Sequence, residues 1–125
     1  MSKGLVLVTG AGQRVGAAIA LNLGQTGWDV GVHYYASREG ADATVAAIRA
    51  AGGKAEAFGA DLTSASDIDA MAAQLSARGD WAGLVNSAAS FENDDIASFA
   101  FPLAEAQMRL NLLTPVYLAR ALAAA

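Results

Sequence analysis

Short apolar segments alternate with longer segments of helical periodicity along the whole of this 125-residue chain. Segments 5–8, 28–35, 54–60 and 81–86 predict strands, because each is short and bounded by glycine or polar residues. Helices are predicted over 14–23, 37–51 and 64–78, and from Pro102 to the C-terminus, with Gly24 or Gly27 ending the first. Such alternation is typical of a parallel sheet with right-handed crossovers and helices on both faces. The expected fold is therefore a three-layer α/β domain.

Composition excludes several classes of protein. Hydrophobic residues make up 54% of the chain and charged residues 16%, so the chain can bury a sizeable core. Twelve acidic against eight basic side chains argue against binding to nucleic-acid backbones. The absence of cysteine and a single histidine, His33, exclude disulfides, thiolate sites and zinc clusters. No apolar run is long enough to span a bilayer and no secretory signal precedes the first strand, so we expect a cytoplasmic protein without membrane partners.

A glycine-rich loop, Thr9-Gly10-Ala11-Gly12-Gln13-Arg14-Val15-Gly16, lies where the first predicted strand turns into the first predicted helix. Glycine lets the backbone approach a ligand closely, and the helix N-terminus presents free N–H groups and the positive end of its dipole. Such a turn suits a diphosphate. It lacks the Gly-Lys-Ser/Thr ending of nucleoside triphosphate loops. The sequence therefore predicts one dinucleotide-binding, Rossmann-like domain over residues 1–125, with strand order 3-2-1-4.

This loop resembles the Thr-Gly-x-x-x-Gly-x-Gly signature of the short-chain dehydrogenase/reductase family, with Arg14 in place of the middle glycine. An arginine there resembles the pteridine-reductase-like branch of the family. The resemblance implies that NADP(H) is the cofactor and that Arg14 reaches its 2′-phosphate. The other loop residues assigned to the cofactor are Gly10, Gly12, Val15 and Gly16.

The end of the second predicted strand supports the same cofactor. An acidic residue there would select NAD by bonding the ribose 2′-hydroxyl, but no carboxylate occurs before Glu39. Arg14, Ser37 and Arg38 could together hold a phosphate dianion, so we expect NADP(H) to be preferred over NAD(H). Arg38 could instead be a solvated arginine at a helix end. The candidate cofactor-binding residues of this segment are His33, Tyr34, Tyr35, Ser37 and Arg38.

Two further segments match the family. Asp61-Leu62, after the third predicted strand, resembles the Asp-aliphatic pair beside the adenine ring, although an aspartate can also simply cap a turn. Residues 86–89, Asn-Ser-Ala-Ala, resemble the family's Asn-Asn-Ala-Gly/Ser and keep small side chains where ribose and nicotinamide would pass. We therefore add Asn86, Ser87 and Ala88 to the cofactor site.

Two residues resemble parts of the reaction site. Phe91 resembles an aromatic residue of the pteridine-reductase-like branch that stacks on a flat heteroaromatic substrate, although it could equally close the core from a loop. Asn111, in Asn-Leu-Leu-Thr-Pro, resembles the asparagine of the family's Asn-x-x-x-Pro, a member of the catalytic tetrad that holds a water in the proton relay. Asparagine is a poor helix former, which supports a functional role independently.

The remaining tetrad residues are not found. Family members carry, further on, a serine and a Tyr-x-x-x-Lys pair, yet none of Tyr34, Tyr35 and Tyr117 is followed four residues later by lysine. In the family that lysine lowers the tyrosine pKa for proton transfer. The expected function is an NADP(H)-dependent oxidoreductase acting on a carbonyl or pterin-like substrate, represented by its cofactor-binding half and inactive alone. The alternative is a non-catalytic dinucleotide-binding or regulatory module.

Association with further copies of the chain is also expected. The fourth predicted strand lies at an edge of the sheet, and the last predicted helix is rich in alanine and leucine. Unpaired strand edges and apolar helix faces both favour association. We therefore expect a homo-oligomer.

Overall fold

The structure, a computed structural model, describes residues 2–89 and 96–125. Four parallel strands form one sheet in the order β3-β2-β1-β4, so the predicted strand order is confirmed. β1 lies between β2 and β4, and its residue Val8 pairs with Val32 on one side and Val85 on the other. The strands are β1 (Leu5–Val8), β2 (Asp29–Tyr34), β3 (Ala55–Gly59) and β4 (Trp81–Val85).

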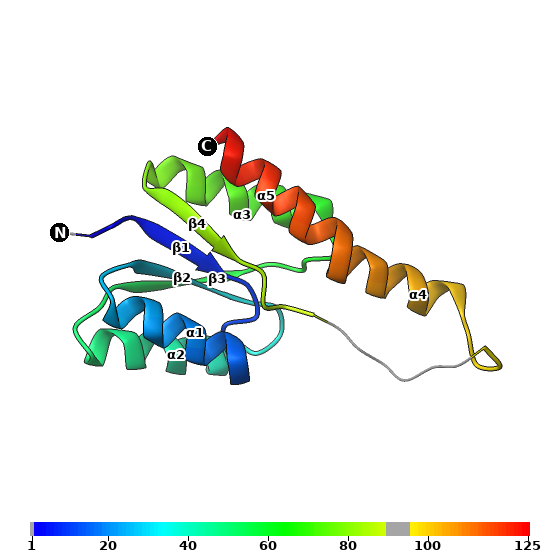
Figure 1. Cartoon of the computed structure of the whole chain (residues 1–125), viewed down its shortest axis with the longest axis horizontal. Coiled ribbons are helices and arrows are strands. Elements are labelled where there is room, and N and C mark those ends of the chain that lie inside the picture. The colour runs from blue at the N-terminus through cyan, green and yellow to red at the C-terminus, as the bar shows by residue number, and fades with distance from the viewer. Residues whose placement is uncertain (1, 90–95) are drawn as a thin grey trace.

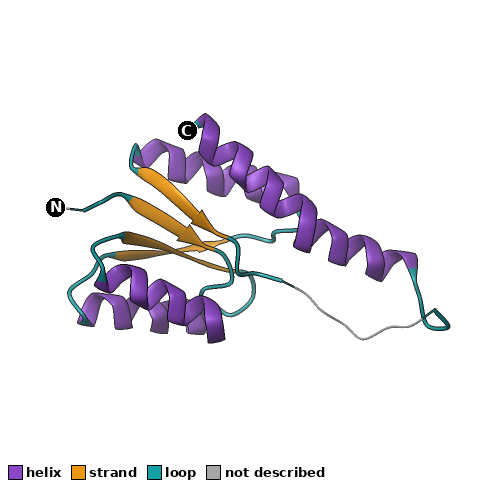
Figure 2. Cartoon of the chain, in the orientation of Figure 1, coloured by secondary structure: helices purple, strands orange, loops and turns teal. Residues whose placement is uncertain are grey.

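Helices cover both faces of the sheet (Figures 1 and 2). α1 and α2 form one layer, and α3 and α5 form the other. α4 continues the line of α5 and extends beyond the sheet (Figure 1). The helices are α1 (Arg14–Gln25), α2 (Arg38–Ala50), α3 (Ala65–Arg78), α4 (Phe101–Met108) and α5 (Thr114–Ala124), with a π-helical turn, η1 (Arg109–Leu113), between the last two.

Burial of β1 on both faces explains its unbroken apolar run. Leu5 and Leu7 belong to the core beneath α3 and α5, whereas Val6 and Val8 belong to the core beneath α1 and α2. A central parallel strand covered on both sides has no polar face to keep. The glycine-rich loop therefore begins at the carboxyl end of a central, fully buried strand.

Of the two glycines predicted as possible ends of the first helix, Gly24 lies within the helix and Gly27 follows its end. α1 continues to Gln25, and Gly27 follows with a φ of +102°. Gly24 instead serves packing, because a Cβ there would lie 2.7 Å from Cγ2 of Ile48 on α2. The missing side chain thus brings α1 and α2 close together.

The last predicted helix is interrupted by η1, which sequence periodicity did not indicate. Both flanks of η1 are tied to the loop after β3: Arg109 Nη1 donates to the Thr63 carbonyl at 3.3 Å, and the buried Thr114 hydroxyl donates to the Leu62 carbonyl. Single π turns are frequent at functional sites. None of the helices in the described part of the chain combines the length and hydrophobicity needed to cross a bilayer.

Candidate functional site

An open cavity of about 650 Å³ lies at the carboxyl ends of the strands. Ligands of open α/β sheets bind at this edge, where the strand order reverses on either side of β1. The loops that follow all four strands contribute to its wall. The lining residues are Gly10, Gln13, Arg14, Val15, Gly16, His33, Tyr35, Asp61, Leu62, Thr63, Ser87, Ala88, Ala89 and Leu110.

The N-terminus of α1 faces this cavity without a cap from its own chain. Gln13 occupies the N-cap position with an extended backbone but makes no side-chain cap bond, and the first turn holds no acidic residue. Val15, whose spacing places it on the helix's apolar stripe, is instead 68% exposed on the cavity wall. The helix start therefore offers a positive dipole end beside an apolar surface, which suits an anion attached to a flat or apolar group.

Packing explains the glycines of the loop. Gly10 has a φ of +63°, and a Cβ there would lie 3.0 Å from Cα of Ala88. At Gly16 a Cβ would lie 2.2 Å from the Gly10 carbonyl oxygen, so the turn cannot close with any side chain present. Gly12 does not line the cavity. It packs against α2 instead, because a Cβ at Gly12 would lie 3.1 Å from the backbone nitrogen of Ala41. The glycines shape the loop, and Gly10 and Gly16 also line the cavity.

Arg14 has a strained backbone. Its φ of +52° makes it the one non-glycine residue with a positive φ in the described part of the chain. A side chain in this region costs about 1–2 kcal/mol, and such strain gathers at functional sites. The family signature has glycine at this position, so the arginine has replaced the residue that would fit without cost. Its exposed side chain lines the cavity.

Thr9 joins the carboxyl ends of β1 and β4. Its hydroxyl accepts hydrogen bonds from the backbone N–H groups of Ser87 and Ala88, each at 3.0 Å. The first residue of the loop signature thereby brings the segment after β4 to the cavity. Asn86, in contrast, is exposed and does not line it. No role was predicted for Thr9, although it is the first residue of the loop signature, directly before Gly10.

His33 connects the glycine-rich loop to the end of β3. Its Nδ1 accepts from the Gly10 amide at 3.0 Å, and its Nε2 lies 2.9 Å from the Ala60 carbonyl oxygen. The ring is 2% exposed, and this burial lowers the pKa of His33 despite the bond to Ala60. His33 is therefore neutral near pH 7 and carries its proton on Nε2, which is the donor toward Ala60.

The predicted phosphate-binding set is only partly brought together. Ser37 does not line the cavity, and its hydroxyl accepts from Gln13 Nε2 at 3.2 Å. Arg38 is also absent from the wall: its Nη1 donates to the Tyr34 hydroxyl at 2.9 Å, and its Nε lies 3.7 Å from an Asp42 oxygen. Tyr34 lies outside the cavity as well. Of the predicted phosphate-binding residues Arg14, Ser37 and Arg38, only Arg14 is among the described residues that line the cavity.

Beyond this set, Tyr35 and Asp61, both predicted to bind the cofactor, line the cavity. Tyr35 is 68% exposed, so its ring is available to a ligand. Asp61 Oδ1 accepts from the Thr63 hydroxyl at 2.7 Å and from the Thr63 amide at 2.9 Å. These bonds lower the pKa of Asp61, which keeps the carboxylate ionised at the mouth of the cavity.

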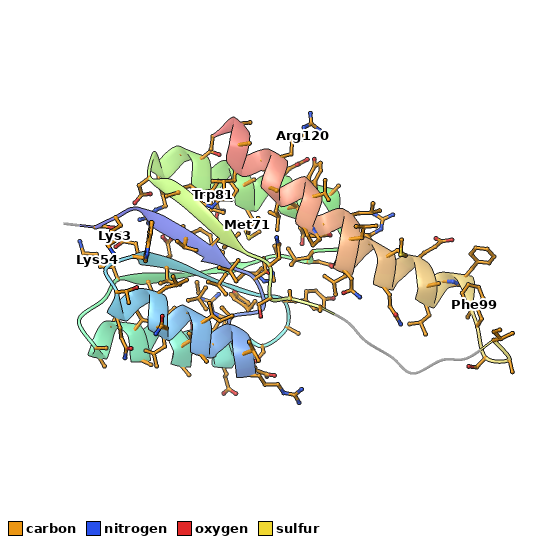
Figure 3. The ribbon with its side chains drawn as sticks, viewed as in Figure 1. Lys3, Lys54, Met71, Trp81, Phe99 and Arg120 are labelled. Carbon is orange, nitrogen blue, oxygen red and sulfur yellow. The ribbon has the colours of Figure 1, made fainter. Side chains whose placement is uncertain are left out.

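The two predicted reaction-site residues have different outcomes. Asn111 lies within η1 and is exposed, and its neighbour Leu110 reaches the cavity wall while Asn111 does not. Phe91 lies outside the described residues. The chain's two lysines, Lys3 and Lys54, lie at the opposite end of the sheet (Figure 3). The lining residues that sequence reasoning did not assign are Gln13, Thr63, Ala89 and Leu110.

Comparisons with known proteins agree with this geometry. The family described as short chain dehydrogenase matches residues 4–125. An uncharacterized oxidoreductase of Methylorubrum extorquens is 52% identical over 61 residues, which are 49% of this chain and 25% of that protein. A metagenomic short-chain oxidoreductase in complex with NADP has a TM-score of 0.89 and 34% identity over 97% of this chain and 55% of its own.

A further solved structure, the FolM alternative dihydrofolate reductase 1 of Brucella suis in complex with NADP, has a TM-score of 0.88 and 32% identity. It matches 98% of this chain and 49% of its own length. The chain thus spans about half the length of the solved structures, and its 61-residue match covers a quarter of the curated relative. With a Rossmann-like sheet, a cavity at its carboxyl edge and a family match over nearly the whole sequence, this chain belongs to the short-chain dehydrogenase family.

Proposed function

We propose that this chain binds NADP(H) and forms the cofactor-binding part of an NADP(H)-dependent oxidoreductase. The observation that carries the proposal is the uncapped start of α1, which opens onto a cavity of about 650 Å³ beside Arg14. The diphosphate would lie against this helix start, where N–H groups and the dipole favour anions. Asp61 and Leu62 would hold the adenine end, and the small residues Ser87 and Ala88 leave room for the nicotinamide end. When bound, the cofactor supplies the hydride.

The preference for NADP(H) over NAD(H) is assigned to Arg14. Its guanidinium forms charge-assisted bonds to phosphate. The strained backbone supports this role, since glycine would avoid the cost and the arginine is nevertheless present. Solved relatives bound to NADP point the same way. Arg38 contributes less, because Tyr34 and Asp42 already hold its guanidinium.

Titration with NADPH and NADH, followed by nucleotide fluorescence, tests this assignment. Arg14→Gln removes the charge while leaving a side chain on the strained backbone, and it should weaken NADPH binding about 10-fold with little change for NADH. Arg38→Gln is the matched control and should change either affinity by less than about twofold. Equal or tighter binding of NADH by the unmodified chain would refute the preference. Failure to bind either nucleotide would refute the proposed function.

The substrate is proposed to be a carbonyl compound or a flat pterin-like heterocycle. The structural likeness to an alternative dihydrofolate reductase supports the second class, as does the arginine within the loop signature. Asn111 is assigned to the proton relay. It lies at the centre of η1, and hydrogen bonds at both ends of η1 join this turn to the Leu62 and Thr63 carbonyls after β3. Because these 125 residues hold no Tyr-x-x-x-Lys pair, we expect nucleotide binding without turnover.

Steady-state assays of NADPH oxidation with a pterin and with a simple ketone check this expectation. Turnover by the chain alone would show that another residue donates the proton. A dinucleotide-binding module without chemistry is the second candidate. It predicts that Asn111→Ala leaves nucleotide affinity unchanged and that adding the remaining half of a relative restores no turnover.

We also propose that copies of the chain associate through η1 and the start of α5. Leu112 and Leu113 of η1 are 49% and 57% exposed, and Val116 of α5 is 64% exposed. The neighbouring edge strand β4 pairs only with β1 among the described strands. Both features favour association. Light scattering at tens of micromolar should give a dimer or larger species, and Leu113→Glu should shift it toward monomer. A strictly monomeric profile of the unmodified chain would contradict this proposal.

A further inference from the structure

The ring of His33 lies behind the glycine-rich loop and is hydrogen-bonded on both sides. Nδ1 accepts from the Gly10 amide at 3.0 Å, and Nε2 lies 2.9 Å from the Ala60 carbonyl oxygen. An amide can only donate and a carbonyl can only accept. The neutral ring with its proton on Nε2 is therefore the only protonation state that satisfies both contacts.

We propose that His33 is a positioning residue whose neutral ring fixes the Gly10 amide, and that protonation of the ring disturbs the diphosphate-binding loop and weakens dinucleotide binding. This inference rests on the proposed function. It adds pH dependence of nucleotide affinity to a site that the loop signature predicts only to bind a nucleotide.

Gly10 is the position through which a disturbance would reach the helix start. Its carbonyl oxygen lies so close to Gly16 that a Cβ on Gly16 would be 2.2 Å away, and its φ of +63° belongs to a conformation that few residues adopt. The next residue is held too, because the Ala11 amide donates to the His33 carbonyl at 3.0 Å. A turn of the Gly10 peptide must therefore shift the first turn of α1, which is the proposed diphosphate site.

Protonation places two N–H donors face to face. A charged ring would carry a proton on Nδ1 as well, opposite the Gly10 amide, while its bond to Ala60 would remain. The ring is 2% exposed and has little room to turn, so the Gly10 peptide is the part that moves. Burial also lowers the pKa of His33, so the charged form accumulates only below its ordinary value of about 6.5.

Other charged groups face the same cavity. They are Arg14 at the start of α1 and Asp61 after β3, with the phenol of Tyr35 after β2. Hydrogen bonds from Thr63 lower the pKa of Asp61, so it stays ionised over the range in which histidine titrates. The wall residues after β4 and on η1 carry no ionisable side chain.

The test compares variants that separate the two bonds. In His33→Asn, the amide oxygen occupies the place of Nδ1 and can accept from Gly10 without titrating. In His33→Leu, both bonds are lost. NADH and NADPH are titrated between about pH 7.5 and about pH 5.5, and NADH serves as the reference because phosphate monoesters, such as the 2′-phosphate, themselves titrate near pH 6.

The unmodified chain should lose NADH affinity about threefold on acidification, whereas His33→Asn should bind with near-normal affinity at both values. His33→Leu should bind about 3- to 10-fold more weakly at both. In the amide NMR spectrum of the unmodified chain, Gly10 should shift together with the His33 ring, and this joint shift should vanish in His33→Asn. Ile48→Val, a buried change in α2 away from the cavity, controls for lost stability and should leave affinity unchanged.

Each contrary result has a distinct meaning. Equal acid sensitivity in His33→Asn, or tighter NADH binding by the unmodified chain at low pH, would overturn the role of His33 while leaving nucleotide binding intact. An affinity loss in Ile48→Val equal to that in His33→Leu would reduce His33 to a structural residue. Absence of binding at about pH 7.5 would overturn the proposed function itself, and this inference with it.

Discussion

The N-termini of α1 and α3 both follow a strand of the same sheet, yet they are built in opposite ways. α3 is capped by its own chain: Ser64 accepts from the Asp67 amide at 3.3 Å, and Asp67 places a carboxylate in the first turn. α1 has no side-chain cap bond and no acidic residue in its first turn. Since a cap typically contributes about 1 kcal/mol, the chain forgoes stability at the helix that faces the cavity.

Backbone strain follows the same division. Ser64, before α3, has an ordinary extended conformation, whereas Arg14 opens α1 with a φ of +52°. The start of α1, which borders the cavity, therefore lacks a capping side chain and a first-turn acidic residue, and it carries a strained backbone at Arg14. Functional sites commonly show this exchange of stability for activity. The contrast makes Gln13 and Arg14 the positions of α1 where changes in stability and nucleotide affinity should have opposite signs.

The largest expected effect is at Gly16. Gly16→Ala places a methyl group 2.2 Å from the Gly10 carbonyl oxygen, which forces the loop and the first turn of α1 apart. We expect a loss of about 2–4 kcal/mol in the free energy of unfolding and loss of measurable NADPH binding. Denaturant unfolding monitored by circular dichroism gives the first value, and fluorescence titration gives the second.

Gly79→Ala is the control for the general cost of changing a glycine. Gly79 ends α3 with a φ of +80°, and a Cβ there would meet nothing within 4 Å. Only backbone strain applies, so we expect a cost of about 1 kcal/mol and unchanged affinity. If Gly79→Ala proved as damaging as Gly16→Ala, the contact with Gly10 would not be what makes Gly16 necessary.

Arg14→Gly should act in opposite directions on stability and on binding. Glycine fits the positive φ, so we expect the free energy of unfolding to rise by about 1 kcal/mol. NADPH affinity should fall, because the guanidinium is lost. Thermal and denaturant unfolding of the variant and the unmodified chain measure the first effect. A less stable variant would show that interactions of the arginine side chain already repay the strain.

Much of the fold could be predicted from the sequence because its pattern is local. Leu5–Val8 is a short, unbroken apolar run between Gly4 and Gly10, and its length favours a strand buried on both faces. The order β3-β2-β1-β4 could be predicted because it is the order of the Rossmann-like fold that the glycine-rich loop indicates. The packing role of Gly24 could not be predicted, because its neighbour Ile48 lies on another helix, and a contact of that kind leaves no mark in local periodicity.

The site was predicted less completely for the same physical reason. Loop positions such as Arg14 and Asp61 could be assigned from motif and place alone, and both line the cavity. Arg38 could not, because its direction depends on Tyr34 and Asp42, which compete with a ligand for the guanidinium. The two hydrogen bonds of His33 join it to residues 23 and 27 positions away, so no local sequence pattern could predict them.

A smaller effect is expected at the start of α3. Ser64→Ala removes the cap and should lower the free energy of unfolding by about 1 kcal/mol. Nucleotide affinity should stay within about twofold, because this helix start does not line the cavity. Ser76→Ala, at an exposed serine of the same helix away from its first turn, is the matched control. A large loss of affinity in Ser64→Ala would mean that both helix starts serve the nucleotide.

The smallest expected change is also the most direct test of the contrast. Gln13 already has the extended backbone of an N-cap residue, with φ of −150° and ψ of 157°. Gln13→Asp should therefore cap α1 and raise the free energy of unfolding by about 0.5–1 kcal/mol. The new carboxylate would occupy the place proposed for the diphosphate, so NADPH affinity should fall about threefold or more.

Gln13→Asn separates capping from charge, since asparagine caps as well as aspartate but is neutral. It should stabilise the chain to a similar degree and weaken NADPH binding less than Gln13→Asp does. Both variants lose the bond from Gln13 to Ser37, so that contact cancels in the comparison. If both raised stability without weakening binding, the bare start of α1 would have no part in holding the nucleotide. The missing cap of α1 would then only lower the free energy of unfolding, and the difference from α3 would have no role in nucleotide binding.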